Sequence, residues 1–142
     1  MSSTPESINQ MLEAINRELI DSGQDTRYHP NSYTFVSSGL EYYITRIGQK
    51  RHVTGQELTC GLLDFSLLQF GPLALDVLNN WGIDQSDDFG NIVYNLIALG
   101  FMSRQENDRL DDFTAVVSIQ YYLELKNIIS IDPEYIRSLK GA

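Results

Sequence analysis

Few side chains in the sequence could carry acid–base or nucleophilic chemistry near neutral pH: His29, His52 and Cys60. Histidine titrates close to neutrality, and a cysteine becomes a nucleophile when a histidine and a carboxylate, here Glu57 or Asp64, activate it. Cys60, however, falls in an apolar stretch, where a free cysteine usually packs as a small hydrophobic residue. Nothing in the local sequence joins it to either histidine. We therefore expect no enzymatic activity.

Metal and cofactor signatures are missing from the sequence. Two histidines without i,i+4 spacing and one cysteine form a poor zinc ligand set. The acidic stretches DQSDD and ENDRLDD lack the glycine and terminal glutamate of a twelve-residue calcium loop. Dinucleotide and phosphate-loop glycine patterns are also absent. We predict neither a metal nor a cofactor.

A second kind of chemistry, the recognition of nucleic-acid bases, could come from Asn91, Tyr94 and Asn95 in the stretch DQSDDFGNIVYNLIALGFMS. Asparagine can pair with the edge of adenine when a recognition helix enters the major groove. The alternative is a helix that turns one side to the core and offers the other to a protein partner. These three residues are therefore candidates for an interaction surface.

Charge argues against the nucleic-acid hypothesis. The recognition helix would begin with Asp84, Asp87 and Asp88, and no Lys or Arg occurs between residues 52 and 103. The whole chain carries a net charge of −9. Neutralisation of phosphates supplies most non-specific affinity for DNA, and this helix lacks the cations to provide it.

The basic residues that could contact an anion or a partner lie outside that helix. Arg46, Lys50 and Arg51 form one cluster beside a histidine, and Arg104 and Arg109 follow the candidate helix. The alternative function is a nucleic-acid-binding regulator. In it, Arg104, Arg109 and the 46–52 loop would bind the phosphate backbone of the nucleic acid. The simpler interpretation of the cluster is a helix C-terminus whose cations offset the helix dipole.

The elements that must position these residues follow from hydrophobic periodicity. The pattern predicts helices over 5–21, 30–47, 54–70, 72–80, 87–99 and 119–128, a β-hairpin over 101–117, and a short helix after Asp132. The order helix, helix, helix, hairpin is typical of a winged helix. We predict a mainly α (α+β) fold in a single domain, 1–142: N-terminal helices (5–48), a winged-helix-like core (53–117) and a helical tail (118–142).

Local signals predict where several helices begin. Thr54 and Glu57 have the spacing of a capping box. Pro30 suits the first turn of a helix that His29 could cap, and Ser86 is expected to cap the helix over 87–99. Gly39, inside a helix, predicts the close approach of another backbone.

Composition indicates an ordinary globular protein. Hydrophobic residues make up 42% and charged residues 20%, with a sequence pI near 4.5. A lone cysteine fits the reducing cytoplasm. We see no signal peptide and no apolar window of about 18 residues, and so expect a cytoplasmic protein with no membrane contact.

Several motifs together resemble a family of small bacterial proteins of unassigned function. They are YHPNSYTFV, RHVTGQEL, FGPLALDVLNNWGI, DDFGNIVYNLIALGFMS and RLDDF, within residues 28–117. The resemblance implies a bacterial, cytoplasmic domain and carries over no catalytic residues.

Four aromatic residues decide whether a partner surface is available. Phe35 and Tyr42 lie off the main stripe of their helix, and Tyr121 and Tyr122 are adjacent in the tail. If exposed, they would mark a protein-binding surface; the alternative is that the first helix or the tail covers them. We predict an accessory module that binds an unknown protein or forms a homodimer.

Overall fold

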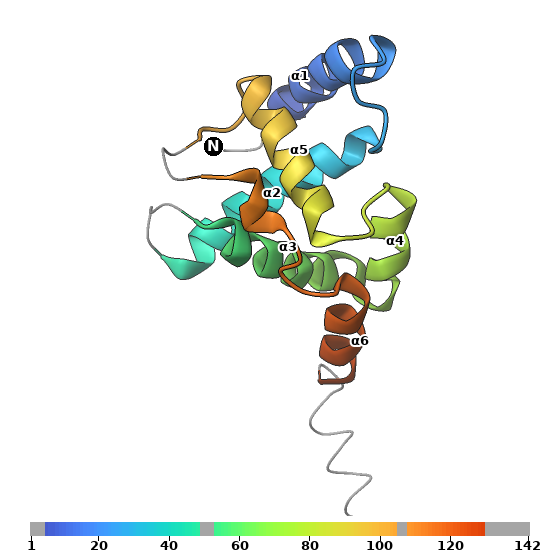
Figure 1. The fold of residues 1–142 in the computed structure, drawn as a ribbon, viewed down its shortest axis with the longest axis vertical. Coiled ribbons are helices and arrows are strands. Elements are labelled where there is room, and N and C mark those ends of the chain that lie inside the picture. Colours follow the sequence, from blue (N-terminus) through green and yellow to red (C-terminus); the bar gives the residue numbers. More distant parts are fainter. Residues whose placement is uncertain (1–4, 49–52, 105–107, 130–142) are drawn as a thin grey trace, which may run out of the picture.

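The computed structural model describes residues 5–48, 53–104 and 108–129 of the 142-residue chain, and every regular element in these ranges is helical (Figure 1). The elements are α1 (Pro5–Ile15), η1 (Asn16–Asp21), α2 (Pro30–Ile47), α3 (Gly55–Phe70), η2 (Gly71–Leu73), α4 (Ala74–Asn80), α5 (Ser86–Ala98), η3 (Leu110–Phe113) and α6 (Ile119–Ile129). The prediction of a mainly helical fold is confirmed. The predicted segment 5–21 is divided, because its last six residues form a π-helix.

The helix starts show how local sequence dictates this architecture. Pro30 occupies the first turn of α2, and Nδ1 of His29 accepts a hydrogen bond from the Asn31 amide (3.0 Å). At α3 the Thr54 hydroxyl accepts from the Glu57 amide (3.1 Å), while the Glu57 carboxylate accepts from the Thr54 amide (3.5 Å). Both predicted starts are confirmed, because each cap needs only neighbours in sequence.

Helix α3 lies at the centre of the core, with Leu58, Leu62, Leu63 and Phe65 buried. Helix α2 packs against it at Gly39, where a Cβ atom would overlap the side chains of Leu62 and Phe65. The predicted close approach is therefore real, but the approaching atoms are side-chain carbons rather than another backbone.

The continuous stretch Gly55–Asn80, which covers α3, η2 and α4, is long and apolar enough to cross a membrane by length and composition alone. The expectation that no stretch reaches this length is therefore not met. The same segment has 44% of its apolar window buried inside the protein, and it turns at Gly71, where φ is +54°. The core helix of a globular protein passes the same test of length and composition.

The predicted β-hairpin over 101–117 is wrong: no strand forms in the described residues of this segment, 101–104 and 108–117. The 3₁₀ turn η3 forms in its place and buries Phe113 against Gly90, where a Cβ atom would lie 2.8 Å from the Cβ of Phe113. Without a hairpin, the winged-helix-like core is not shown.

Side chains at the start of α5 account for this difference. The amide of Ala115 donates to Oδ1 of Asp87 (3.3 Å), and the amide of Val116 donates to the Ser86 hydroxyl (3.1 Å). That hydroxyl in turn donates to the Phe113 carbonyl (2.7 Å). Backbone groups that a hairpin would pair with each other are satisfied by a helix N-terminus instead.

Helix α6 confirms the first predicted helix of the tail, and it packs on α3 and α4 of its own chain (Figure 1). Ile119 and Leu123 are buried in that contact, and the Tyr122 hydroxyl donates to Asp64 of α3 (2.7 Å). The predicted helix after Asp132 lies outside the described residues.

Candidate functional site

The N-terminus of α5 is fixed by one carboxylate. Oδ2 of Asp88 accepts from the amides of Asp84 (2.9 Å) and Gln85 (3.0 Å), so Gln85 rather than Ser86 is the N-cap. Ser86 is the first residue of the helix and is buried. The sequence pattern placed this cap one residue too late, because it could not foresee that Phe113 would use the Ser86 hydroxyl.

The two asparagines predicted to lie on an interaction surface make hydrogen bonds inside the protein. Nδ2 of Asn91 donates to the Tyr28 hydroxyl (2.9 Å). Nδ2 of Asn95 donates to Oδ2 of Asp25 (2.9 Å) and to the Tyr33 hydroxyl (3.0 Å). Both side chains therefore attach α5 to the segment before α2 and to α2 itself, which is a structural role.

Asp25 is the charged centre of this network, which we call the α5 polar network (Asp25, Arg27, Tyr28, Tyr33, Asp88, Asn91 and Asn95). Its carboxylate accepts a two-point contact from Arg27, with N–O distances of 3.0 and 2.7 Å, and its side chain is 8% exposed. The Arg27 hydrogen bonds, assisted by Asn95, lower the Asp25 pKa from 3.8 to about 2, against the opposing effect of burial.

Burial also raises the pKa of the Tyr28 hydroxyl, and its donation to Asp88 (2.6 Å) raises it further. Tyr28 therefore stays protonated and acts as a donor to Asp88 and an acceptor from Asn91. Each side chain in the network has its partner, which is how buried polar groups avoid the cost of desolvation.

Tyr94, the third predicted residue of this helix, is placed differently. Its hydroxyl oxygen is buried and has no hydrogen-bond partner among the described residues, and desolvation raises its pKa. The guanidinium of Arg104 lies 5.8 Å from the ring centroid and donates to the Asp108 carbonyl (3.0 Å). The structure thus brings Tyr94 and Arg104 together, apart from the two asparagines.

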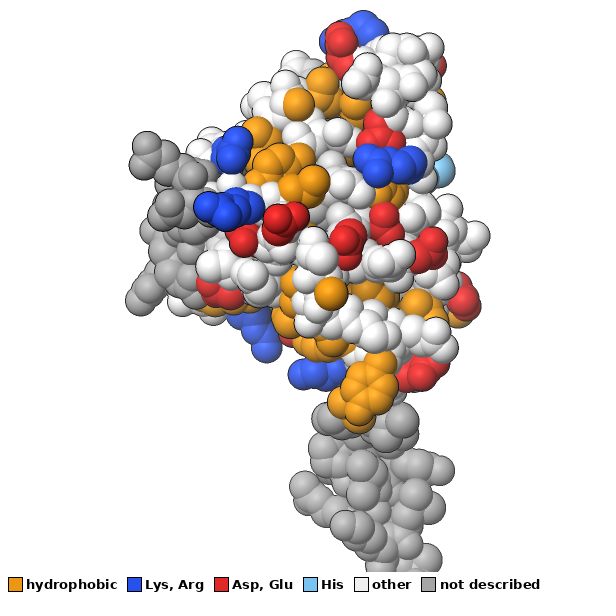
Figure 2. Space-filling view, in the orientation of Figure 1, with side chains coloured by type: hydrophobic (Ala, Val, Ile, Leu, Met, Phe, Trp, Pro, Cys, Tyr) orange, Lys and Arg blue, Asp and Glu red, His pale blue; other side chains and the backbone are white. Residues whose placement is uncertain are grey.

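The predicted basic cluster is only partly described. Nη1 of Arg46 donates to the Tyr42 hydroxyl (2.8 Å) on the same helix, while Lys50, Arg51 and His52 lie outside the described residues. On the face drawn in Figure 2, acidic side chains lie between the basic ones, so the described residues of this face form no continuous positive band. A band of that kind is what a phosphate backbone requires.

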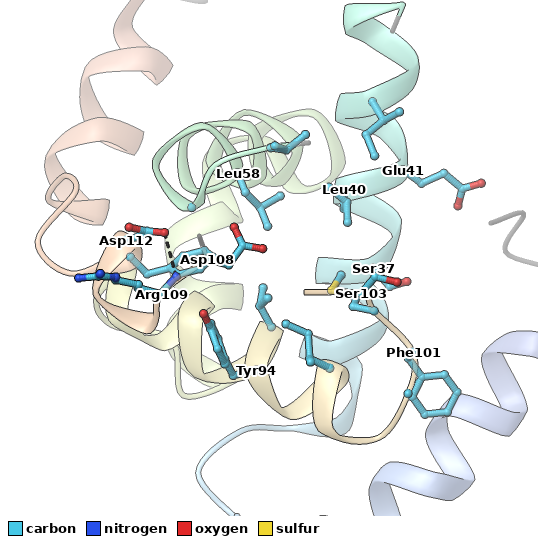
Figure 3. Close-up of a pocket in the computed structure, with 18 of the residues that line it drawn as sticks. Ser37, Leu40, Glu41, Leu58, Tyr94, Phe101, Ser103, Asp108, Arg109 and Asp112 are labelled. Atoms are coloured by element: carbon cyan, nitrogen blue, oxygen red, sulfur yellow. Dashed lines mark hydrogen bonds between the residues drawn. The ribbon is translucent and has the colours of Figure 1, made fainter. Parts of the chain in front are cut away.

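A cavity of about 810 Å³ opens between α2, the start of α3, the second half of α5 and residues 100–103 and 108–113 (Figure 3). Leu40, Leu58, Val93 and Ile97 are among its apolar walls, and Tyr94 is also in the lining. The sequence did not predict this cavity. Four separate segments build it, so no local pattern could reveal it.

Large apolar side chains also remain exposed near α6. Tyr121 and Leu125, which we call the α6 surface, are 64% and 42% exposed and lie one helical turn apart. Leu68 and Leu73 near the α3–α4 junction are also exposed, and α6 packs on both of those helices. Figure 2 shows hydrophobic side chains on this lower part of the molecule.

The four aromatic residues whose exposure the sequence left open divide into two groups. Phe35 is buried, with its ring centroid 5.2 Å from that of Phe65 and 5.4 Å from that of Trp81. Tyr42 packs on Phe65 at 5.2 Å. These neighbours belong to α3 and to the end of α4, not to the first helix or the tail. Tyr121 alone stays largely exposed.

The candidate catalytic groups do not form a site in the described residues. His29 is used as a helix cap. Burial and the neighbouring Asp64 carboxylate raise the pKa of the Cys60 thiol, which lowers its thiolate fraction at neutral pH. In the described ranges, 5–48, 53–104 and 108–129, no three His, Cys, Asp or Glu side chains gather as metal ligands.

Comparison with known proteins gives one distant relative. The chain is 28% identical over 103 residues to COMM domain-containing protein 5 of Dictyostelium discoideum. The match covers 72% of this chain and 42% of that protein, so the chain spans less than half of its relative's length. No family profile and no solved structure matched. The relative is eukaryotic, so the comparisons do not support the bacterial origin implied by the sequence motifs.

Proposed function

We propose that the chain is an accessory module that binds another protein through the α6 surface and has no catalytic activity of its own. The observation that supports this is the exposure of Tyr121 and Leu125 on a helix whose other side is already buried. Exposed aromatic and aliphatic side chains of this kind are typical of protein interfaces. The distant similarity to a COMM domain-containing protein is compatible with an accessory role.

The chemistry of the candidate catalytic groups supports the non-catalytic part of the proposal. A thiol with a raised pKa is a poor nucleophile, and the one described histidine caps a helix. A lone cysteine also fits a reducing compartment, and we propose the cytoplasm as the site of action.

The test is affinity capture with the full chain, comparing the wild type with the double variant Tyr121→Ser/Leu125→Ser. We expect the double variant to lose at least tenfold of the captured partner, or of its own dimer in light-scattering measurements, because both apolar contacts are removed. Leu110→Ser is the matched control, since Leu110 is a 45% exposed leucine on η3. Equal losses in both variants would contradict the proposal.

The nucleic-acid alternative is tested separately by gel retardation at physiological salt. We expect no retention of DNA, because acidic groups surround the start of α5 and the hairpin of a winged helix is absent from the described residues. Retention that weakens in an Asn91→Ala/Tyr94→Ala variant would favour the regulator over the accessory module.

A further inference from the structure

We propose that the cavity between α2 and α5 binds a small uncharged amphipathic molecule, with an apolar chain or ring and one hydroxyl or carbonyl group. This would be a second function, independent of the α6 surface. The proposal depends on the size of the cavity, the apolar character of its walls, and the placement of its charges and hydroxyls.

Size and wall chemistry match those of ligand sites. A volume of about 810 Å³ lies within the range of about 300–1,000 Å³ that such sites occupy. Leu40, Ile97, Phe101 and Met102 line it, and all four are only partly buried although they pack against the core. An apolar occupant would remove that surface from water, which is favourable by roughly 25 cal/mol per Å².

The charges of the described lining residues disfavour an anionic ligand. In that set Glu41, Asp108 and Asp112 carry negative charge, and Arg109 carries positive charge. In Figure 3 the Asp108 carboxylate lies toward the cavity, whereas the Glu41 carboxylate and the Arg109 guanidinium point away from it. A carboxylate or phosphate headgroup would therefore meet the like charge of Asp108, and no labelled cation in this view points into the cavity to compensate it.

The same carboxylates do not favour a cationic ligand either. Glu41 and Asp108 each have an interaction partner within the protein. Oδ2 of Asp112 accepts from the Arg109 amide at 3.1 Å. Because these charges are already engaged, a ligand amine would have to compete for them and also lose its own hydration.

Neutral hydroxyl groups remain for recognition. Ser37 and Ser103 line the cavity, and the hydroxyl of Tyr94 points toward Leu58 and Arg109 (Figure 3) without a partner among the described residues. A buried hydroxyl without a hydrogen bond is unfavourable, because it has lost its bonds to water without replacement. After a small side-chain shift, a ligand hydroxyl or carbonyl between Leu58 and Arg109 would supply that bond.

The test is an NMR titration of the full chain with 1-octanol and, separately, with octanoate, which has the same chain length and a carboxylate. We expect saturable shifts of the methyl signals of Leu40, Ile97 and Met102 with 1-octanol, and at least tenfold weaker binding of octanoate. Equal or tighter binding of octanoate, or the absence of saturable shifts with 1-octanol, would overturn the proposal.

Two variants locate the binding. Ile97→Trp should fill the cavity and weaken 1-octanol binding at least tenfold, while Leu73→Trp, on the exposed η2 turn, should leave it unchanged. Far-UV circular dichroism checks that both fold, and Ser37→Leu replaces Ile97→Trp if the latter does not. Shifts confined to residues outside the cavity would also overturn the assignment.

The α6 surface variant separates this inference from the proposed function. Tyr121→Ser/Leu125→Ser should bind 1-octanol as the wild type does, even where it loses its protein partner. If Ile97→Trp abolishes protein capture and the wild type does not bind 1-octanol, the cavity receives a side chain of the partner, and the small-molecule proposal fails.

Discussion

Polar residues on two sides of α5 differ in whether their hydrogen-bonding groups have partners. On one side, Asn91 and Asn95 donate hydrogen bonds to Tyr28, Asp25 and Tyr33, and each donor in the α5 polar network has an acceptor. On the other side, the buried Tyr94 hydroxyl lacks a partner among the described residues, and Tyr94 is one of the residues that line the cavity. Helix α5 thus has a closed side, where the hydrogen bonds of Asn91 and Asn95 are satisfied, and an open side, where the Tyr94 hydroxyl has no described partner.

Residue type therefore does not decide whether a polar side chain is available for binding. Asn91 and Asn95 resemble base-reading residues by sequence, yet the segment before α2 uses both. Their role is to hold that segment against α5 at sites where a simple apolar contact would leave tyrosine hydroxyls and a carboxylate unsatisfied. The hydroxyl without a described partner belongs to Tyr94, which directly precedes Asn95 and lines the cavity.

The largest change in stability is expected when a hydrogen-bond donor is removed from the closed side of α5. Asn95→Leu leaves Oδ2 of Asp25 and the Tyr33 hydroxyl each without one hydrogen bond, and we expect the free energy of unfolding to fall by about 3 kcal/mol. Urea denaturation measures it. Asn80→Leu, the same change at an exposed position on α4, should alter stability by less than about 0.5 kcal/mol. Similar losses in both variants would show that the network contributes little.

A smaller effect is expected from pH. The Asp25 pKa is lowered from 3.8 to about 2 in the folded protein, so its contribution is complete above about pH 5 and is lost as the pH falls toward 2. Linkage gives a loss of on the order of 2 kcal/mol. Stability curves for the wild type and Asp25→Asn should converge over this window. Parallel curves between pH 5 and 2 would mean that Asp25 is not held in its charged form.

The smallest effect concerns the open side and has the opposite sign. Tyr94→Phe deletes a buried hydroxyl that has no described partner, so we expect unchanged or higher stability, by up to about 1 kcal/mol. Tyr33→Phe makes the same change on the closed side and should lower stability by about 1 kcal/mol, because Asn95 loses an acceptor. Thermal unfolding of the two variants compares them directly, and a destabilised Tyr94→Phe would indicate a partner for that hydroxyl.

Elements whose signals are local could be predicted from the sequence. The bounds of α2 and the start of α3 agree with prediction because Pro30, His29 and the Thr54–Glu57 pair act within one turn of the helix. The prediction of a strand pair after α5 failed because Ser86 and Asp87 accept backbone amides that lie about 30 residues away in the chain. No local pattern encodes such a contact.

The same distinction applies to the candidate site. The sequence predicts one surface for Asn91, Tyr94 and Asn95, since closely spaced polar residues of one helix look equivalent in sequence. Tyr28 and Asp25 are the partners that give the two asparagines a structural role. The sequence did not predict these contacts, because each partner lies 60 or more residues away in the chain.

The mainly helical content, the starts of α2 and α3 and the acidic character of the chain follow from the sequence alone, since they depend on residues within a turn of one another or on composition. Tertiary structure decided which polar groups of α5 are satisfied, where the cavity opens and which apolar side chains remain exposed. The physical reason is that hydrogen-bond satisfaction and burial depend on contacts between segments far apart in the chain, and packing fixes those contacts only when all segments come together.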